Sequence, residues 1–233
     1  MNGTLHAVGA FEVAYTRRAR LIVEALDPVT LDLVGQGLRI RVDGLDAEPV
    51  LSTGRRYVWF EERGRTPKTL RIDPGTLPYL PVERAVDPLP APPPPPAKPQ
   101  TWTLMRIELA PSTAYPFAPG ITAYRGSFIV NATDNPAVGL ADAEVHLQWI
   151  DDSQAGEVWV DAPNRSRTSA KGDFVALLRL GPSQIARADA QHRMRVRVVV
   201  TPAGTTTTRV TPELQIPFNR LTDAAGSFVW SAL

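Results

Sequence analysis

The chain has 233 residues, 23 prolines, 16 glycines, no cysteine and a net charge of +1. Hydrophobic residues at 43% and charged residues at 21% are typical of a globular protein and exclude a disordered chain, and the missing cysteines exclude a disulfide scaffold, a thiolate metal site and a cysteine nucleophile. Basic and acidic residues balance in both halves (12 and 11 in residues 1–86, 12 and 12 in residues 100–233), so no basic module indicates nucleic-acid binding.

The N-terminus does not resemble a signal peptide. Its apolar stretch, residues 7–11, is short, and Arg17, Arg18 and Arg20 follow it instead of preceding it. No stretch reaches the roughly 18 apolar residues of a membrane span. We therefore expect synthesis and folding in the cytoplasm, no membrane span, and a protein that could later form part of a released particle.

Short strands are predicted throughout the first half. Leu21, Val23 and Ala25 place apolar residues at every second position, and residues 38–42 alternate between apolar and basic residues. Aromatic and β-branched residues predict further strands at 57–60 and around Leu70 and Ile72. Turn residues separate these segments: Gly44, Pro49, Gly54, Gly64, Pro67, Pro74 and Gly75. This spacing predicts a β-sandwich or barrel over residues 1–86.

Residues 87–99 contain eight prolines in 13 positions. Such a run lacks amide donors and has a fixed φ, so it cannot join a helix or a central strand. It should form polyproline II of roughly 40 Å when fully extended, at about 3.1 Å per residue. We interpret it as a stiff linker between two domains; the alternative is a docking segment for an SH3-like or WW-like partner.

The second half repeats the strand pattern. Strands are predicted at residues 126–130, 144–149, 174–178, 194–200 and 209–210, separated by turn-rich segments. One short helical turn is predicted at residues 182–190. The sequence therefore predicts a second sandwich over residues 100–233.

Thr168, Gly172 and Phe174 form a Thr-x-x-x-Gly-x-Phe pattern after a predicted strand, and residues 135–143 precede that strand with a Pro-Ala-Val-Gly-Leu-Ala sequence. This combination resembles the carboxypeptidase-regulatory-like and transthyretin (prealbumin)-like β-sandwich modules. The first half matches the pattern less closely, with Thr53 directly before Gly54. The resemblance implies an all-β protein of two small immunoglobulin/prealbumin-like sandwiches joined by a polyproline linker. It also implies a non-catalytic appendage, adhesin or assembly part, and it assigns no catalytic residue.

The sequence offers no recognisable catalytic or cofactor motif. His6, His146 and His192 lack metal-ligand spacing and are expected on the surface, and there is no Gly-x-Ser-x-Gly elbow or phosphate-binding glycine loop. Ser127 and Ser227 are interpreted as strand starts. We therefore expect no enzyme activity, no cofactor and no metal.

Two ligand classes remain open. Six aspartates fall in turns of the second half and are either turn residues or calcium ligands: Asp134, Asp142, Asp151, Asp152, Asp161 and Asp173. Trp149 and Tyr57 lie in phase with the core, whereas Trp102, Trp159 and Trp230 have no assigned position and could form a carbohydrate platform.

Two segments are candidates for an interaction surface. Arg193, Arg195 and Arg197 line one side of a predicted strand, and such a row either binds anions, with Arg39 and Arg41 of the other half, or keeps a solvent face soluble. The apolar C-terminal segment with Phe228 and Trp230 forms the last strand of its own sandwich or inserts into a neighbouring subunit. Residues 11–15 pose the same question of strand exchange at the N-terminus.

These observations favour a non-catalytic structural or adaptor protein. We expect it to space or join protein partners in a larger assembly, for which a phage-tail-like contractile injection particle is one setting. The alternative is a ligand-binding module for carbohydrate or calcium.

Overall fold

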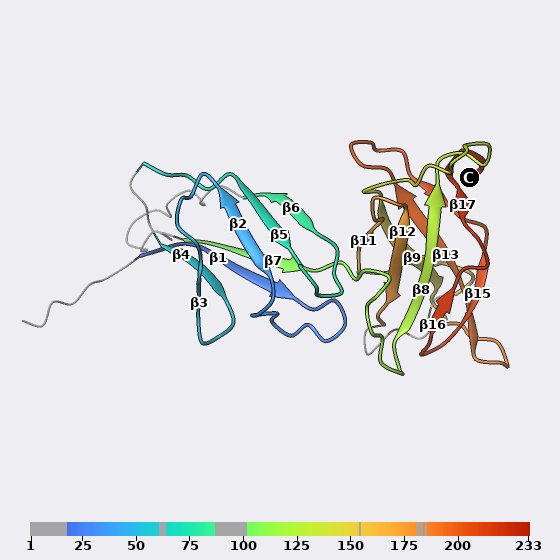
Figure 1. Cartoon of the computed structure of the whole chain (residues 1–233). Helices are drawn as coiled ribbons and strands as arrows, with labels where there is room; N and C mark the ends of the chain where they lie inside the picture. The colour runs from blue at the N-terminus through green and yellow to red at the C-terminus, as the bar shows by residue number, and fades with distance from the viewer. Residues whose placement is uncertain (1–17, 61–63, 87–101, 154, 181–183, 185) are drawn as a thin grey trace, which may run out of the picture.

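The computed structural model describes residues 18–60, 64–86, 102–153, 155–180, 184 and 186–233. Within these residues the chain consists of strands and one short 3-10 helix, η1 (Trp230–Ala232), so the all-β prediction is confirmed. The strands form four sheets, which are arranged as an N-terminal sheet pair and a C-terminal sheet pair (Figure 1).

The N-terminal sheet pair combines a four-stranded sheet of order β3-β4-β1-β7 with a three-stranded sheet of order β2-β5-β6. Its strands are β1 (Ala19–Leu26), β2 (Arg39–Asp43), β3 (Val50–Leu51), β4 (Tyr57–Phe60), β5 (Thr69–Asp73), β6 (Val82–Ala85) and β7 (Thr103–Glu108). Leu21, Trp59, Leu70, Ile72 and Met105 meet in one core between the two sheets. The strands predicted from alternation in the first half are therefore confirmed.

The proline-rich segment does not separate the two sheet pairs. Residues 87–101 lie outside the described residues, so the polyproline prediction concerns a segment that the structure does not describe. The strands on either side are both part of the N-terminal sheet pair: β6 pairs with β5, and β7 pairs in parallel with β1. The boundary expected at residue 100 is thereby corrected, and residues 109–121 connect the two sheet pairs.

The physical reason for this correction lies in β7. Its residues alternate strictly between buried and exposed, and Met105 and Ile107 complete the first core. The segment pairs with a strand about 80 residues earlier, a non-local contact that no local pattern announces. The proline run looks like a domain boundary, although it connects two strands of one sheet pair.

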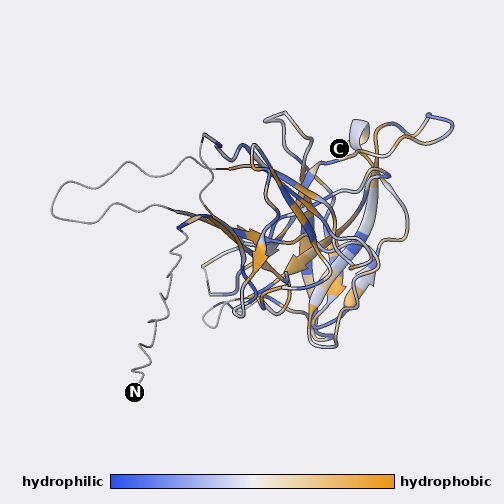
Figure 2. Ribbon diagram, turned by 60° about the vertical axis from the view of Figure 1, so that its left-hand side comes forward, coloured by the Kyte–Doolittle hydropathy of each residue, from blue (hydrophilic) through white to orange (hydrophobic). Residues whose placement is uncertain are grey.

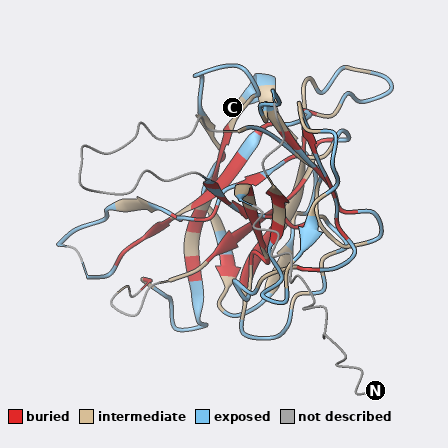
Figure 3. Ribbon diagram, turned by 90° about the vertical axis from the view of Figure 1, so that its left-hand side faces the viewer, coloured by how far each residue is buried: buried red, intermediate tan, exposed pale blue. Residues whose placement is uncertain are grey.

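The C-terminal sheet pair combines two larger sheets. One has the order β10-β9-β13-β14, with β11 paired to β9 and β15 to β13; the other has the order β12-β8-β16, with β17 paired to β8. The strands are β8 (Thr122–Ile129), β9 (Glu144–Ile150), β10 (Trp159–Asp161), β11 (Ser166–Arg167), β12 (Asp173–Leu178), β13 (Arg193–Thr201), β14 (Arg209–Val210), β15 (Leu214–Pro217), β16 (Leu221–Asp223) and β17 (Phe228–Val229). Apolar and buried residues concentrate in the strands of both pairs (Figures 2 and 3).

Each residue of the Thr-x-x-x-Gly-x-Phe pattern has a structural role in this core. The Thr168 hydroxyl donates to the carbonyl of Leu140 at 2.5 Å and accepts from the backbone N–H of Ala143 at 2.9 Å. Gly172 has φ +83°, and a Cβ there would lie 2.1 Å from a backbone carbonyl oxygen of β8. Phe174 stacks on Phe128, with 5.0 Å between ring centroids. Glycine is therefore required at this hairpin.

The predicted helical turn at residues 182–190 is wrong where the structure describes it. Ala186 forms a bridge with Asp151, and Ala188 forms one with Met194. These residues run beside neighbouring strands because a poorly patterned segment gains more from such pairing than from one isolated helical turn.

Candidate interaction surfaces

The three arginines predicted as an interaction surface lie on β13, and each already has a partner within the chain. Arg193 pairs with Asp189 at 3.0 Å, Arg195 pairs with Glu157 at 2.6 Å and with Glu213 at 2.7 Å, and Arg197 donates to Gln148 at 2.7 Å and lies 4.2 Å from the ring centroid of Trp159. The hydrogen bonds from Arg195 hold the pKa of Glu213 below its usual range. An anionic ligand would have to displace these internal partners.

Arg39 and Arg41 do not extend this row. Both lie on β2 of the N-terminal sheet pair, and Arg39 is 3.9 Å from Asp73 across the β2–β5 pair. The two basic strands named by the sequence therefore belong to different sheets, and the arrangement favours a solubilising role for each.

The C-terminal segment with Phe228 and Trp230 packs within its own chain. Strands β16 and β17 both pair in parallel with β8. The Phe228 ring lies 5.3 Å from that of Phe128, and the guanidinium of Arg209 lies 4.5 Å from the Trp230 ring while donating to the Trp230 carbonyl at 2.5 Å. The N-terminal segment, residues 11–15, lies outside the described residues.

His146 is buried, which corrects the expectation of a surface histidine. It is 8% exposed, and its Nε2 lies 3.3 Å from a carboxylate oxygen of Asp161. Burial, reinforced by the nearby charge of Arg165, lowers the pKa of His146 despite that carboxylate. His192 is exposed as expected, at a turn with φ +56°, and His6 lies outside the described residues.

Two of the six aspartates considered as calcium ligands already have partners within the chain. Asp151 accepts the N–H of Ser153 at 2.9 Å, and Asp152 pairs with Arg187 at 2.7 Å. Among the residues that the structure describes, no group of three or more His, Cys, Asp or Glu side chains is arranged to hold a metal ion. Likewise, no helix within the described part of the chain is long and apolar enough to span a membrane.

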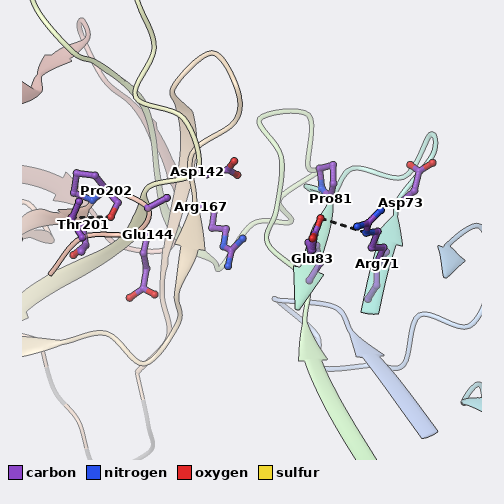
Figure 4. Close-up of a pocket in the computed structure, with 14 residues that line it drawn as sticks. Arg71, Asp73, Pro81, Glu83, Asp142, Glu144, Arg167, Thr201 and Pro202 are labelled. Carbon is purple, nitrogen blue, oxygen red and sulfur yellow. Dashed lines mark hydrogen bonds and ion pairs between the residues drawn. The ribbon is translucent and has the colours of Figure 1, made fainter. Parts of the chain in front are cut away.

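A cleft of about 770 Å³ lies between the two sheet pairs (Figure 4). Arg71, Asp73 and Glu83 line it from β5 and β6, and Glu144 and Arg167 line it from β9 and β11. Positive and negative side chains are mixed on both walls, and Arg71 lies 3.6 Å from Glu83. The cleft therefore has no dominant charge that would select one class of ligand.

A buried carboxylate fixes the connecting segment, residues 109–121, to the N-terminal sheet pair. Asp27 follows β1, is 8% exposed, and accepts the hydroxyls of Tyr79 at 2.8 Å and Tyr115 at 2.7 Å. It also accepts the backbone N–H groups of Val29 and Thr30, both at 2.8 Å. Burial opposes the charge, but these hydrogen bonds outweigh it, and the pKa of Asp27 is lowered.

A second set of contacts joins the two sheet pairs directly. The guanidinium of Arg179, just after β12, donates to the carbonyls of Pro28 at 2.6 Å and Val29 at 2.5 Å. Asn164 donates to Glu108 at 2.6 Å. An apolar cluster on the outer face of the β12-β8-β16 sheet includes one residue of the N-terminal pair; its members are Ala123, Val175, Leu177, Val29, Phe117, Ile121 and Leu221.

We call these two sets of contacts the junction. No local sequence pattern indicates the junction as a unit, because the tyrosines that bind Asp27 lie 52 and 88 residues further along the chain and Arg179 about 150 residues away. Only the local turn at Asp27, in which an Asp accepts nearby amides, had a recognisable pattern.

Comparisons with known proteins place this architecture among distant structural matches only. No family model matches the chain, and no curated protein matches it in sequence. The TIE protein of Bacillus anthracis aligns with 91% of this chain at 8% identity and a TM-score of 0.26, and this chain covers 34% of its length. A DUF3823 family protein from Bacteroides ovatus ATCC 8483 aligns with 87% of this chain and 99% of its own, at 12% identity and a TM-score of 0.25. Similarities at this level assign neither a family nor a function.

Proposed function

We propose that this chain is a non-catalytic structural adaptor that holds protein partners at a fixed spacing in a larger assembly. The junction carries the proposal. A connection that is held in place by a buried carboxylate, an arginine and an apolar cluster limits the motion between two modules. An unconstrained linker would leave their spacing variable. A fixed spacing is useful to a protein that positions other proteins.

Each sheet pair is, in this proposal, a β-sandwich of the immunoglobulin/prealbumin kind. The roles of Thr168, Gly172 and Phe174 support the carboxypeptidase-regulatory-like assignment for the C-terminal pair. Modules of this kind present outer sheet faces and loops to partners while their cores stay closed. The contractile injection particle remains a prediction about the setting, as do carbohydrate and calcium as ligands.

The direct test is the size of the complex that contains the protein in its native host. We expect the tagged full-length chain to elute with a high-mass assembly and to remain with it through a second purification step. A chain that elutes from native cells only as a lone monomer would overturn the proposal.

The fixed spacing is tested separately by electron paramagnetic resonance. Because the chain has no cysteine, Thr53→Cys and Thr205→Cys introduce one spin label in each sheet pair at exposed positions. We expect one narrow distance distribution, which broadens when Asp27→Asn and Arg179→Gln are combined. Arg193→Gln, which changes an ion pair with Asp189 and none of the junction's contacts, serves as the control and should leave the distribution narrow. A broad distribution in the unmodified background would contradict the rigid junction.

A further inference from the structure

An apolar row crosses the outer face of the β3-β4-β1-β7 sheet. Val50 of β3 is in register with Val58 of β4, Val58 with Ile22 of β1, and Ile22 with Leu104 of β7. Because side chains alternate along a strand, all four lie on the face opposite to the core residues Val23, Tyr57 and Met105. We call these four residues the apolar row.

No hydrophobic core in the described part of the chain includes the apolar row. Its four residues are absent from all three core clusters and from the residues that pack against them. Val50 is 50% exposed and Leu104 is 38% exposed, at the two edges of the sheet. Ile22 and Val58 between them are half-buried. Single exposed apolar residues are ordinary, but an apolar row that continues across four strands and is exposed at both edges favours a contact surface.

A charged row lies directly beside the apolar row. Glu24 lies two residues after Ile22 on β1. Its carboxylate accepts hydrogen bonds from Nε of Arg56 and Nε of Arg106, each at 2.7 Å. The Glu24 side chain is only 6% exposed, whereas those of Arg56 and Arg106 are 47% and 69% exposed. Two guanidiniums therefore share one covered carboxylate, and this charged row of Arg56, Glu24 and Arg106 has a net positive charge.

We propose that this face is the docking site for a different protein of the assembly, whose contact surface is apolar and bordered by carboxylates. The inference rests on the proposed adaptor function and names the chemistry of one partner. A carboxylate on that partner would pair with Arg106 or Arg56 while its apolar residues cover the row. A second copy of this chain fits less well, because two such charged rows brought together would contain four arginines and only two carboxylates.

Incorporation of variants into the native high-mass assembly tests this face. Leu104→Glu and Val50→Glu each place a charge in the contact and should lower the incorporated fraction at least tenfold, the change that about 1.4 kcal/mol produces. Val138→Glu is the matched control, because Val138 is 52% exposed in the C-terminal sheet pair. Arg106→Gln should lower incorporation less and weaken its dependence on salt. Melting temperatures of the purified variants show whether each one still folds.

The outcomes separate the two proposals. If the unmodified chain is monomeric in its host, the adaptor function itself fails. If the unmodified chain enters the assembly and the Leu104→Glu and Val50→Glu variants enter equally well, the function stands and the docking face is overturned.

A photo-cross-linking residue at position 104, with the same residue at position 138 as control, identifies the occupant within the purified assembly. We expect a cross-link from position 104 to a different protein, at an apolar segment flanked by Asp or Glu. A cross-link to a second copy, a cross-link within the same chain, or no cross-link from position 104 would each overturn the proposal.

Discussion

The outer face of the β3-β4-β1-β7 sheet and the outer face of the sheet containing β13 differ in how the charges of their arginines are paired with acidic side chains. On β13, Arg195 binds two exposed acids, Glu157 and Glu213, and the row is balanced by its own neighbours. On the N-terminal face, Arg56 and Arg106 share the covered carboxylate of Glu24, so positive charge is left over beside an apolar row.

This difference shows that a charge pattern in a sequence is a poor guide to an interaction surface. The alternating arginines of β13 are conspicuous because they lie on one strand, yet the fold brings acids to each side of them. The apolar row is inconspicuous because it takes one residue from each of four strands. A face becomes a contact surface when apolar side chains stay uncovered and charges stay unbalanced after folding. Only the tertiary structure shows which side chains these are.

The largest expected difference between the faces follows from removing one carboxylate on each. Glu24→Gln should lower the free energy of unfolding by about 1–2 kcal/mol, because two charge-assisted hydrogen bonds are lost while the exposed ends of Arg56 and Arg106 remain screened by solvent. Glu213→Gln, which removes one exposed partner of Arg195 and leaves Glu157 in place, should lower the stability much less. Urea denaturation of both variants measures the difference in their free energies of unfolding. Equal losses of stability would contradict the proposed difference between the two faces.

The same variant changes the response to acid. The hydrogen bond from Arg56 and then that from Arg106 hold the pKa of Glu24 below its usual range. The unfolded chain therefore binds this proton at a higher pH than the folded chain, so the stabilisation is present at neutral pH and is lost as pH falls through the folded-state pKa. Glu24→Gln should reduce the loss of stability below about pH 4.5. If the loss of stability at acid pH is the same in Glu24→Gln and in the unmodified protein, Glu24 does not contribute to that loss.

A smaller effect is expected where an arginine covers an aromatic ring. Arg197→Ala should lower the free energy of unfolding by about 0.5–1 kcal/mol, because its guanidinium lies over Trp159 and donates to Gln148. Arg197→Lys keeps the charge but loses the planar stacking, so its free energy of unfolding should lie between those of the unmodified protein and Arg197→Ala. Arg41→Ala, on an exposed strand of the other sheet pair, is the control. If Arg197→Ala matches this control in urea denaturation, the stacking has no measurable effect.

Much of the fold was predictable because it is encoded locally. Alternation identified β1, β2, β9 and β13, and turn residues separated them as expected. The Thr168, Gly172 and Phe174 pattern was also readable, since a hairpin that needs a positive φ and a close backbone contact requires glycine at one position.

What could not be predicted depends on distant parts of the chain. The membership of β7 in the first sheet, the two tyrosines on Asp27 and the apolar row all require partners tens of residues apart. The expectation of an exposed His146 is wrong because neighbouring side chains cover that residue on the outer face of its sheet. The candidate residues Phe228 and Trp230 were correctly recognised as needing a docking place, and that place is within their own chain.

The smallest effect concerns pH on the β13 face, where His146 is covered. Burial, followed by the charge of Arg165, lowers the pKa of His146, so the unfolded chain takes up this proton first as the pH falls. Stability should therefore decrease as pH falls through about 6.5 and stop changing below the folded-state pKa. The loss of stability due to His146 begins near pH 6.5, above the range in which Glu24 starts to take up its proton in the unfolded chain. Thermal unfolding between pH 7.5 and 5.5 should show a slope that His146→Gln removes and His192→Gln retains. A slope that persists in the His146→Gln variant would assign the titration to another group and would erase this difference between the faces.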